Sequence, residues 1–172
     1  MEYNAAYAML TCHDNTHKLK DEKPEVFVKR AMKAHHDTVL EHIWLTYEVR
    51  DLSIACLQEL ARHRHITLSV ESTRHTLKKK LVDDFIENEV IGNDMDKWEY
   101  LGWFRNFASK RPDITNDELK YYLPEFWPTN LVMTANVREL RHIIALRTAP
   151  AALKEFQDLA LAKGNTIYAF DS

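Results

Sequence analysis

The stretch RHRHITLSVESTRH, residues 62–75, dominates the interpretation of this 172-residue chain. Three arginines and three histidines stand among hydroxyl residues, with one carboxylate, Glu71. A guanidinium stays charged at any working pH and grips phosphate through a planar fork of N–H donors. Hydroxyl groups between the arginines can add short donors to the same oxygens. The stretch therefore predicts a site that folds its arginines toward one phosphorylated or otherwise anionic ligand.

The sequence on either side of this stretch predicts how the chain holds it. Residues 43–50 alternate between apolar and polar side chains, which is the period of a strand with one buried face. Ser53 is a good N-cap for a helix over 54–61 that leads directly into Arg62. Residues 66–70 can extend again, and 131–134 form a second brief extended piece. A strand is therefore expected before the arginine-rich stretch and an extended segment within it.

Most of the remaining chain reads as helix. Apolar spacing, prolines and a capping-box pattern at Thr115 and Glu118 predict helices. They are expected over residues 24–33, 81–89, 97–110, a short segment after 115, 137–147 and 151–162. Residues 5–11 are expected to form an edge strand, and 13–23 a loop. Without an internal repeat or linker, residues 1–172 are expected to form one helix-dominated α+β domain.

Composition excludes several classes of protein. Three glycines leave no room for a glycine-rich phosphate loop, and a net charge of −3 argues against a general nucleic-acid binder. No apolar run approaches the roughly 18 residues that span a membrane, and no signal peptide opens the chain. Cys12 and Cys56 make no disulfide framework, and Cys56 is expected to be a buried, inert thiol. A cytoplasmic protein without a membrane or nucleic-acid partner is expected.

The segment HHDTVLEH, residues 35–42, is a second candidate site. Its three histidines and two carboxylates could ligate a metal ion, and His36-Asp37 resembles the dyad of the HD phosphohydrolases. The remaining histidine and aspartate of such a site have no obvious place in the chain. The competing interpretation, which we favour, is a polar turn between helix and strand with Glu41 and His42 hydrogen-bonded locally.

The segment NVRELRH, residues 136–142, and the residues up to Arg147 form a third candidate. Arg138 and His142 are four residues apart and share one face of a helix whose apolar side chains supply the other face. Salt bridges of Arg138 or Arg141 with Glu139 or Glu155 are the ordinary explanation of these charges.

Together, the three segments resemble the flavin-dependent thymidylate synthase family. Arg62-His63-Arg64, seven residues and then Ser72, with Arg74 two further on, is similar to the family's signature. HDTVLEH resembles the family's His-x-Ser-x-x-Glu-His element. Leu123-Pro124, the segment 134–138, His142 and Leu146-Arg147 resemble its C-terminal half in order and spacing. The likeness spans about residues 36 to 160.

The resemblance implies a specific fold and a specific chemistry. The fold would be helix-rich with a small, mainly antiparallel sheet, in a homotetramer with shared active sites. The reaction would be the reductive methylation of dUMP to dTMP by FAD, a reduced nicotinamide such as NADPH, and methylenetetrahydrofolate. In this family no cysteine attacks the pyrimidine, so the redox chemistry would belong to the flavin.

The resemblance also implies roles for individual residues. The flavin would be held by Thr38, Glu41, Arg62, His63, Arg64, Asn136, Arg138 and His142. The nucleotide would be held by Glu59, Arg62, Glu71, Ser72, Thr73, Arg74, Lys120 and Arg147. Arg147 would face the uracil ring and stabilise negative charge there, acting electrostatically because a guanidinium does not give up its proton.

The chain departs from the family pattern mainly on the nucleotide side. Glu59 stands where the family has glutamine, and its carboxylate would repel a phosphate unless an arginine pairs with it. Val70 replaces a glutamate for which Glu71 could substitute, Leu153 replaces a glutamine, and Lys120 an arginine. One alternative is therefore a homologue that acts on another pyrimidine deoxynucleotide or transfers a hydroxymethyl group. Alternatives of another class are a metal-dependent phosphohydrolase and a non-catalytic nucleotide-binding module using residues 62–80.

Overall fold

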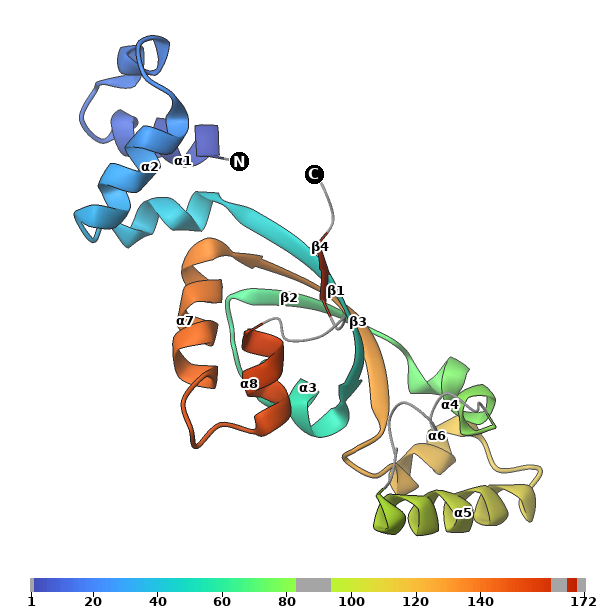
Figure 1. Cartoon of the computed structure of the whole chain (residues 1–172). Coiled ribbons are helices and arrows are strands. Elements are labelled where there is room, and N and C mark those ends of the chain that lie inside the picture. Colours follow the sequence, from blue (N-terminus) through green and yellow to red (C-terminus); the bar gives the residue numbers. More distant parts are fainter. Residues whose placement is uncertain (1, 83–93, 162–166, 170–172) are drawn as a thin grey trace.

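A four-stranded antiparallel sheet forms the centre of an elongated molecule (Figure 1). The computed structural model describes residues 2–82, 94–161 and 167–169. Strand order is β2-β3-β1-β4, with β1 (Trp44–Ser53), β2 (Ile66–Val70), β3 (Pro128–Asn136) and β4 (Ile167–Ala169). This confirms the prediction of a helix-rich α+β fold with a small antiparallel sheet. The strand expected at 131–134 is part of the longer β3.

Helices lie at both ends of the sheet and against one of its faces (Figure 1). The N-terminal end contains α1 (Glu2–Thr11), η1 (Thr16–Lys20), α2 (Pro24–Lys33) and η2 (Asp37–His42). The opposite end contains α4 (Thr73–Leu81), α5 (Met95–Ser109), α6 (Asn116–Leu119) and η4 (Lys120–Tyr122). The covered face carries α3 (Ile54–Leu60), α7 (Val137–Arg147) and α8 (Lys154–Ala160). The helices expected at 24–33, 54–61, 97–110 and 137–147, and the capping box at Thr115, are confirmed.

The edge strand expected over residues 5–11 is wrong, because this segment lies within α1. Ala5, Ala6 and Leu10 are buried against α2 and η2. The nearly unbroken apolar sequence gives no period that would separate helix from strand. The loop expected at 13–23 contains the short turn η1, and most of the helix expected at 81–89 lies outside the described residues.

Three apolar clusters follow one another along the molecule. The first packs α1 and α2 around Phe27, and the second fills the face of the sheet around Val49 and Phe156. The third surrounds Phe104 and Trp127 beneath α4 and α5. The single-domain organisation of residues 1–172 stays a prediction. The second apolar cluster positions the candidate site, because α3, α7 and α8 all pack on it.

The junction of β1 and α3 sets the direction in which the arginine-rich stretch leaves the sheet. Asp51 adopts a left-handed backbone conformation (φ 58°), and the β1–β3 register shifts between Val49 and Leu52. Ser53 then caps α3, because its Oγ accepts a hydrogen bond from the Cys56 N–H at 3.1 Å. Glu155 of α8 accepts hydrogen bonds from the Ser53 N–H (2.8 Å) and hydroxyl. These bonds fix α3 against α8 and thereby place the residues from Glu59 onward.

Candidate active site

Arg147, the last residue of α7, lies at the centre of a polar cluster. Its Nη1 donates to Glu59 Oε2 at 2.6 Å, and its Nη2 donates to the Glu59 backbone carbonyl at 3.2 Å. Its Nε donates to Nε2 of His63 at 3.2 Å, and its guanidinium carbon lies 4.8 Å from the ring centre of Phe156. These contacts from α3, α8 and the residues after α3 fix the guanidinium plane. Phe156 was not predicted as a site residue, since an aromatic residue in an amphipathic helix reads simply as core.

His63 connects this cluster to a buried carboxylate. Its Nδ1 lies 3.2 Å from Oε1 of Glu139, and both residues are buried. Burial, reinforced by the charge of Arg147, lowers the pKa of His63 below its usual value despite the nearby carboxylate. The ring of His142 lies edge-on to the ring of His63, with centroids 6.1 Å apart. His63 is therefore a neutral, internal part of the site, and its expected contact with a flavin stays a prediction.

Glu59 is paired with two arginines, as expected for a carboxylate that lies near a phosphate site. Its carboxylate binds Arg147 on one oxygen and Arg62 on the other, at 2.6 and 3.2 Å. The hydrogen bond from Arg147 is the largest cause of the lowered pKa of Glu59. With two guanidinium partners, this carboxylate does not present an uncompensated negative charge to a nearby phosphate.

A second cluster lies where the start of α7 meets η2. Arg138 binds Glu41, and Arg141 binds Asp37 at 2.8 Å. The expected salt bridges of these arginines with Glu139 or Glu155 are wrong, because Glu139 is bonded to His63 and Glu155 to Ser53. A shallow pocket of about 270 Å³ is lined by Asp37, Arg138, Arg141 and His142. Neither Arg141 nor Asp37 was expected to bind the flavin, and Asp37 was considered only as a metal ligand.

Two further residues expected to bind the flavin differ in exposure. Thr38 is exposed on η2 beside the pocket. Asn136 is buried and caps α7, since its Oδ1 accepts a hydrogen bond from the Glu139 N–H at 2.8 Å. Its first task is thus to begin the helix that carries Arg138 and His142.

A third cluster surrounds the start of α4. Arg74 Nε lies 2.8 Å from Asp117, and Lys120 approaches the same carboxylate at 3.3 Å. The hydrogen bond from Arg74 is the largest cause of the lowered pKa of Asp117. Ser72 is exposed at the N-cap position of α4, and Thr73 is the first residue of the helix. Hydroxyls, cations and a helix N-terminus therefore meet here, as an anion site requires.

Glu71 is held by structural contacts rather than pointing freely into this cluster. Its Oε2 accepts hydrogen bonds from Lys80 at 2.7 Å and from Asn130 at 2.8 Å. Lys80 is half-buried and paired with this carboxylate, so it is not simply part of a solvated helix surface. Val70, the preceding residue, is exposed at the end of β2.

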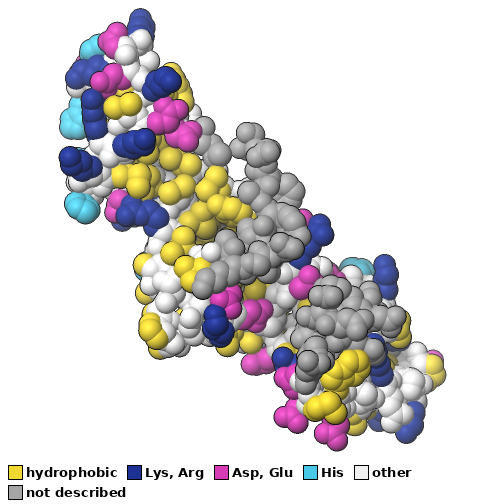
Figure 2. Space-filling view, in the orientation of Figure 1, with side chains coloured by type: hydrophobic (Ala, Val, Ile, Leu, Met, Phe, Trp, Pro, Cys, Tyr) yellow, Lys and Arg dark blue, Asp and Glu magenta, His cyan; other side chains and the backbone are white. Residues whose placement is uncertain are grey.

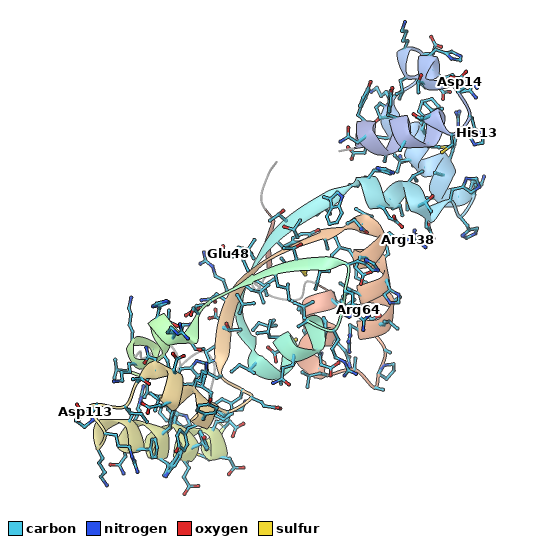
Figure 3. The ribbon with its side chains drawn as sticks, turned by 180° about the vertical axis from the view of Figure 1, so that it is seen from behind. His13, Asp14, Glu48, Arg64, Asp113 and Arg138 are labelled. Carbon is cyan, nitrogen blue, oxygen red and sulfur yellow. The ribbon has the colours of Figure 1, made fainter. Side chains whose placement is uncertain are left out.

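The structure separates the two ends of the arginine-rich stretch. Strand β2 lies between them, and its five residues extend over about 16 Å. Residues 62–64 lie beside α7, whereas 72–74 lie at the start of α4, so the two ends of the stretch lie apart within one chain. Their convergence on one ligand stays a prediction. Arg64 is exposed and has no hydrogen-bond or ion-pair partner in the described part of the chain. Figure 3 places it with Arg138 along the α7 side of the sheet, far from Asp113 at the opposite end.

Two other expectations concern metal ions and thiols. Among residues 2–82, 94–161 and 167–169, no three His, Cys, Asp or Glu side chains converge as metal ligands do, and Asp37 is paired with Arg141 instead. Cys56 is fully buried, as predicted, and burial raises the pKa of its thiol to about 12. No helix in the described residues is long and apolar enough to cross a membrane.

Comparisons with known proteins agree with the motifs. Residues 1–169 match the model of the family described as thymidylate synthase complementing protein. The flavin-dependent thymidylate synthase of Wolinella succinogenes is 36% identical over 169 residues, covering 90% of this chain and 83% of that protein. The enzyme of Campylobacter jejuni (strain RM1221) is 36% identical over 175 residues, covering 91% and 83%.

A solved structure shows the same fold. The thymidylate synthase of Helicobacter pylori, crystallised with FAD and dUMP, superposes with a TM-score of 0.79 at 32% sequence identity. The match covers 94% of this chain and 86% of that one. The fold and the sequence are therefore similar over nearly the whole chain. The chain belongs to the flavin-dependent thymidylate synthase family.

Proposed function

We propose that this chain catalyses the reductive methylation of dUMP to dTMP, using FAD, NADPH and methylenetetrahydrofolate, and that Arg147 is its catalytic residue. The observation that carries the proposal is the fixed guanidinium of Arg147, held by Glu59, His63 and Phe156. A cation positioned before the substrate arrives needs no reorganisation when negative charge develops on the pyrimidine ring.

The residues of the second polar cluster, where α7 meets η2, fit a flavin dinucleotide. Arg138, Arg141 and His142 gather positive and hydrogen-bonding groups around a pocket of about 270 Å³, next to the exposed hydroxyl of Thr38. Each guanidinium has five N–H donors, so binding Glu41 or Asp37 leaves donors for the oxygens of a diphosphate. Bound FAD would supply the hydride chemistry, while these residues would bind and orient it.

The third cluster fits the phosphate of the nucleotide. Arg74 is a forked cation, and Lys120 adds a second positive charge beside it. The Ser72 and Thr73 hydroxyls and the N-terminus of α4 add donors. Both cations are bound to Asp117 in the free chain, so phosphate would compete with this carboxylate. With Glu59 neutralised by Arg147 and Arg62, no electrostatic objection to dUMP comes from the departure at that position.

Neither cysteine suits nucleophilic attack on the pyrimidine. Cys56 is buried on α3 with a thiol pKa of about 12, so its reactive thiolate is scarce at neutral pH. Cys12 is exposed, but it follows α1 at the N-terminal end of the molecule, away from Arg147. Activation of the ring by charge, rather than by a covalent adduct with cysteine, is consistent with this arrangement.

We propose a homotetramer with active sites shared between chains. Within one chain, β2 extends over about 16 Å between the residues beside Arg147 and those beside Arg74. A second copy that brought its Arg74 next to Arg147 would shorten the span that one mononucleotide must bridge. Hydrophobic side chains gather where the N-terminal helices meet the sheet (Figure 2), and Tyr3, Tyr7 and Trp44 are each about half exposed there. Such a surface supports contacts with further copies. Sedimentation of a monomer at working concentration would contradict the shared sites.

The purified full chain tests the proposal directly. Absorbance near the flavin bands is expected, either as purified or after adding FAD, and dTMP is expected to form from dUMP, methylenetetrahydrofolate and NADPH. A parallel assay with dCMP separates the divergent-substrate alternative, and product mass separates methyl from hydroxymethyl transfer. A protein that takes up no FAD, or one that turns over dCMP and not dUMP, would overturn the assignment.

A further inference from the structure

Glu139 is a buried carboxylate that has no role in the proposed reaction as described so far. It lies in the first turn of α7, with 9% of the residue exposed. Burying a carboxylate is costly unless hydrogen bonds compensate it, so its position demands a partner. That partner is Nδ1 of His63, 3.2 Å from Glu139 Oε1. The pair joins residues 76 positions apart in the chain, and nothing in the local sequence pattern predicts it.

The hydrogen bonds of His63 determine where its proton lies. Arg147 Nε is always a donor, and it lies 3.2 Å from Nε2 of His63. Nε2 must therefore be the unprotonated nitrogen, which leaves the proton on Nδ1, where it is donated to Glu139. A carboxylate on one side and a guanidinium on the other thus select a single neutral tautomer.

The groups around His63 come from two helices and support the same assignment. Glu139, His142 and Arg147 face it from α7, and Phe156 faces it from α8 with ring centroids 6.3 Å apart. Phe156 also underlies the Arg147 guanidinium. The imidazole is thus confined between the carboxylate and the guanidinium, with its plane fixed by the aromatic ring. A half-turn flip of the ring would put carbon atoms where the two nitrogens lie and would break both hydrogen bonds.

We infer that Glu139 is a positioning residue: it holds His63 as the Nδ1–H tautomer, so that Nε2 fixes the guanidinium plane of Arg147. The inference rests on the proposed function, because it matters for catalysis only if Arg147 faces the pyrimidine. Glu59 holds one side of Arg147 and the Glu139–His63 pair holds the other. Without Glu139, His63 could place its proton on Nε2, which would then point a donor at the guanidinium and displace it.

Two substitutions separate positioning from packing. Glu139→Leu keeps much of the side-chain volume but removes the acceptor, and it is expected to lower kcat for dTMP formation by about 10–100-fold, as removing such supporting partners does. FAD content is expected to stay unchanged. Glu139→Gln offers an amide oxygen that can accept from Nδ1–H, so it is expected to retain most of the wild-type kcat. A merely structural carboxylate would not be rescued in this selective way.

A third variant keeps the test decisive if Glu139→Leu does not fold. Glu139→Asp keeps the charge and withdraws the carboxylate by one methylene, so kcat is expected to fall while the protein stays folded and binds FAD. ¹⁵N spectra of labelled histidine give an activity-independent readout: His63 is expected as the Nδ1–H tautomer in the wild type.

The outcomes distinguish this inference from the proposed function. A wild-type protein that forms no dTMP would count against the proposed function, while the tautomer of His63 would still test the hydrogen-bond assignment. An active wild type whose folded, FAD-loaded Leu or Asp variant keeps an unchanged kcat would overturn the role of Glu139. A proton found on Nε2 in the wild type would overturn it as well.

Discussion

Replacing Arg147 with lysine separates the charge of this residue from its geometry. Arginine makes three hydrogen bonds here, to the carboxylate and carbonyl of Glu59 and to Nε2 of His63. A lysine ammonium is a point charge on a flexible stem and can keep the contact with the Glu59 carboxylate, but not all three at once. Two lost hydrogen bonds correspond to about 1–3 kcal/mol of unfolding free energy. The protein is therefore expected to stay folded with a lowered midpoint of denaturation.

The effect of Arg147→Lys on catalysis is expected to be larger than its effect on stability. A preorganised donor of this kind contributes about 10²–10³ in kcat. The assay is single-turnover formation of dTMP in the FAD-loaded protein, with flavin content and urea denaturation measured in parallel. Flavin binding is expected to persist, because Arg138 and Arg141 lie in the separate pocket beside η2.

Arg30→Lys is the matched control for this experiment. Arg30 pairs with Glu22 through two hydrogen bonds of 2.7 and 3.0 Å, in the N-terminal helices away from the candidate site. It is expected to leave turnover unchanged. If Arg147→Lys, folded and carrying FAD, formed dTMP as fast as the wild type, the fixed guanidinium plane would have no catalytic importance and the assignment would be wrong.

Three further predictions follow from buried groups. Burial and Arg147 lower the pKa of His63, so the unfolded chain binds more protons at this residue than the folded chain does. The free energy of unfolding is therefore expected to fall as the pH drops below about 6.5, and to fall more in the wild type than in His63→Gln. Thermal unfolding of both proteins between pH 7 and 5 tests this. Glu155→Leu leaves the Ser53 N–H and hydroxyl without their acceptor and should cost about 1–3 kcal/mol in urea denaturation, whereas an unchanged midpoint would refute the clamp. The Cys56→Ala variant should still form dTMP, and loss of turnover in this variant, folded and loaded with flavin, would restore a role for the thiol. Alkylation of the native wild type should modify Cys12 but not Cys56, as measured by the masses of the two peptides.

The predictable part of the fold is the part that local chemistry controls. The alternation over residues 43–50 gave β1, because side chains of a strand face opposite sides at every step. Ser53 and Thr115 began helices as expected, since their hydroxyls accept hydrogen bonds from the first helical N–H groups. The edge strand expected at residues 5–11 was wrong because this segment carries no such local signal. Ala5, Ala6 and Leu10 carry no period of two, and only their packing against α2 and η2 identifies the segment as helix.

The candidate site also has a part that the sequence predicted and a part that it did not. The order and spacing of Arg62-His63-Arg64, Ser72 and Arg147 were enough to indicate the family, because a family signature is a property of the sequence. The spacing did not predict that β2 would separate residues 62–64 from 72–74. An extended strand turns a short sequence interval into a long distance, and whether residues 66–70 extend depends on their pairing with β3.

By itself, the sequence determined the family, most of the helices, the position of β1 and the absence of a glycine-rich phosphate loop. Only the tertiary structure decided the partners of the charges: Glu59 with Arg147, Glu139 with His63, and Asp37 with Arg141. These pairs join residues 76 to 104 positions apart. Their formation depends on how α7 packs against α3, η2 and the sheet. Electrostatic attraction is short-ranged beside solvent, so a charge finds its partner only after hydrophobic packing has brought the two elements together.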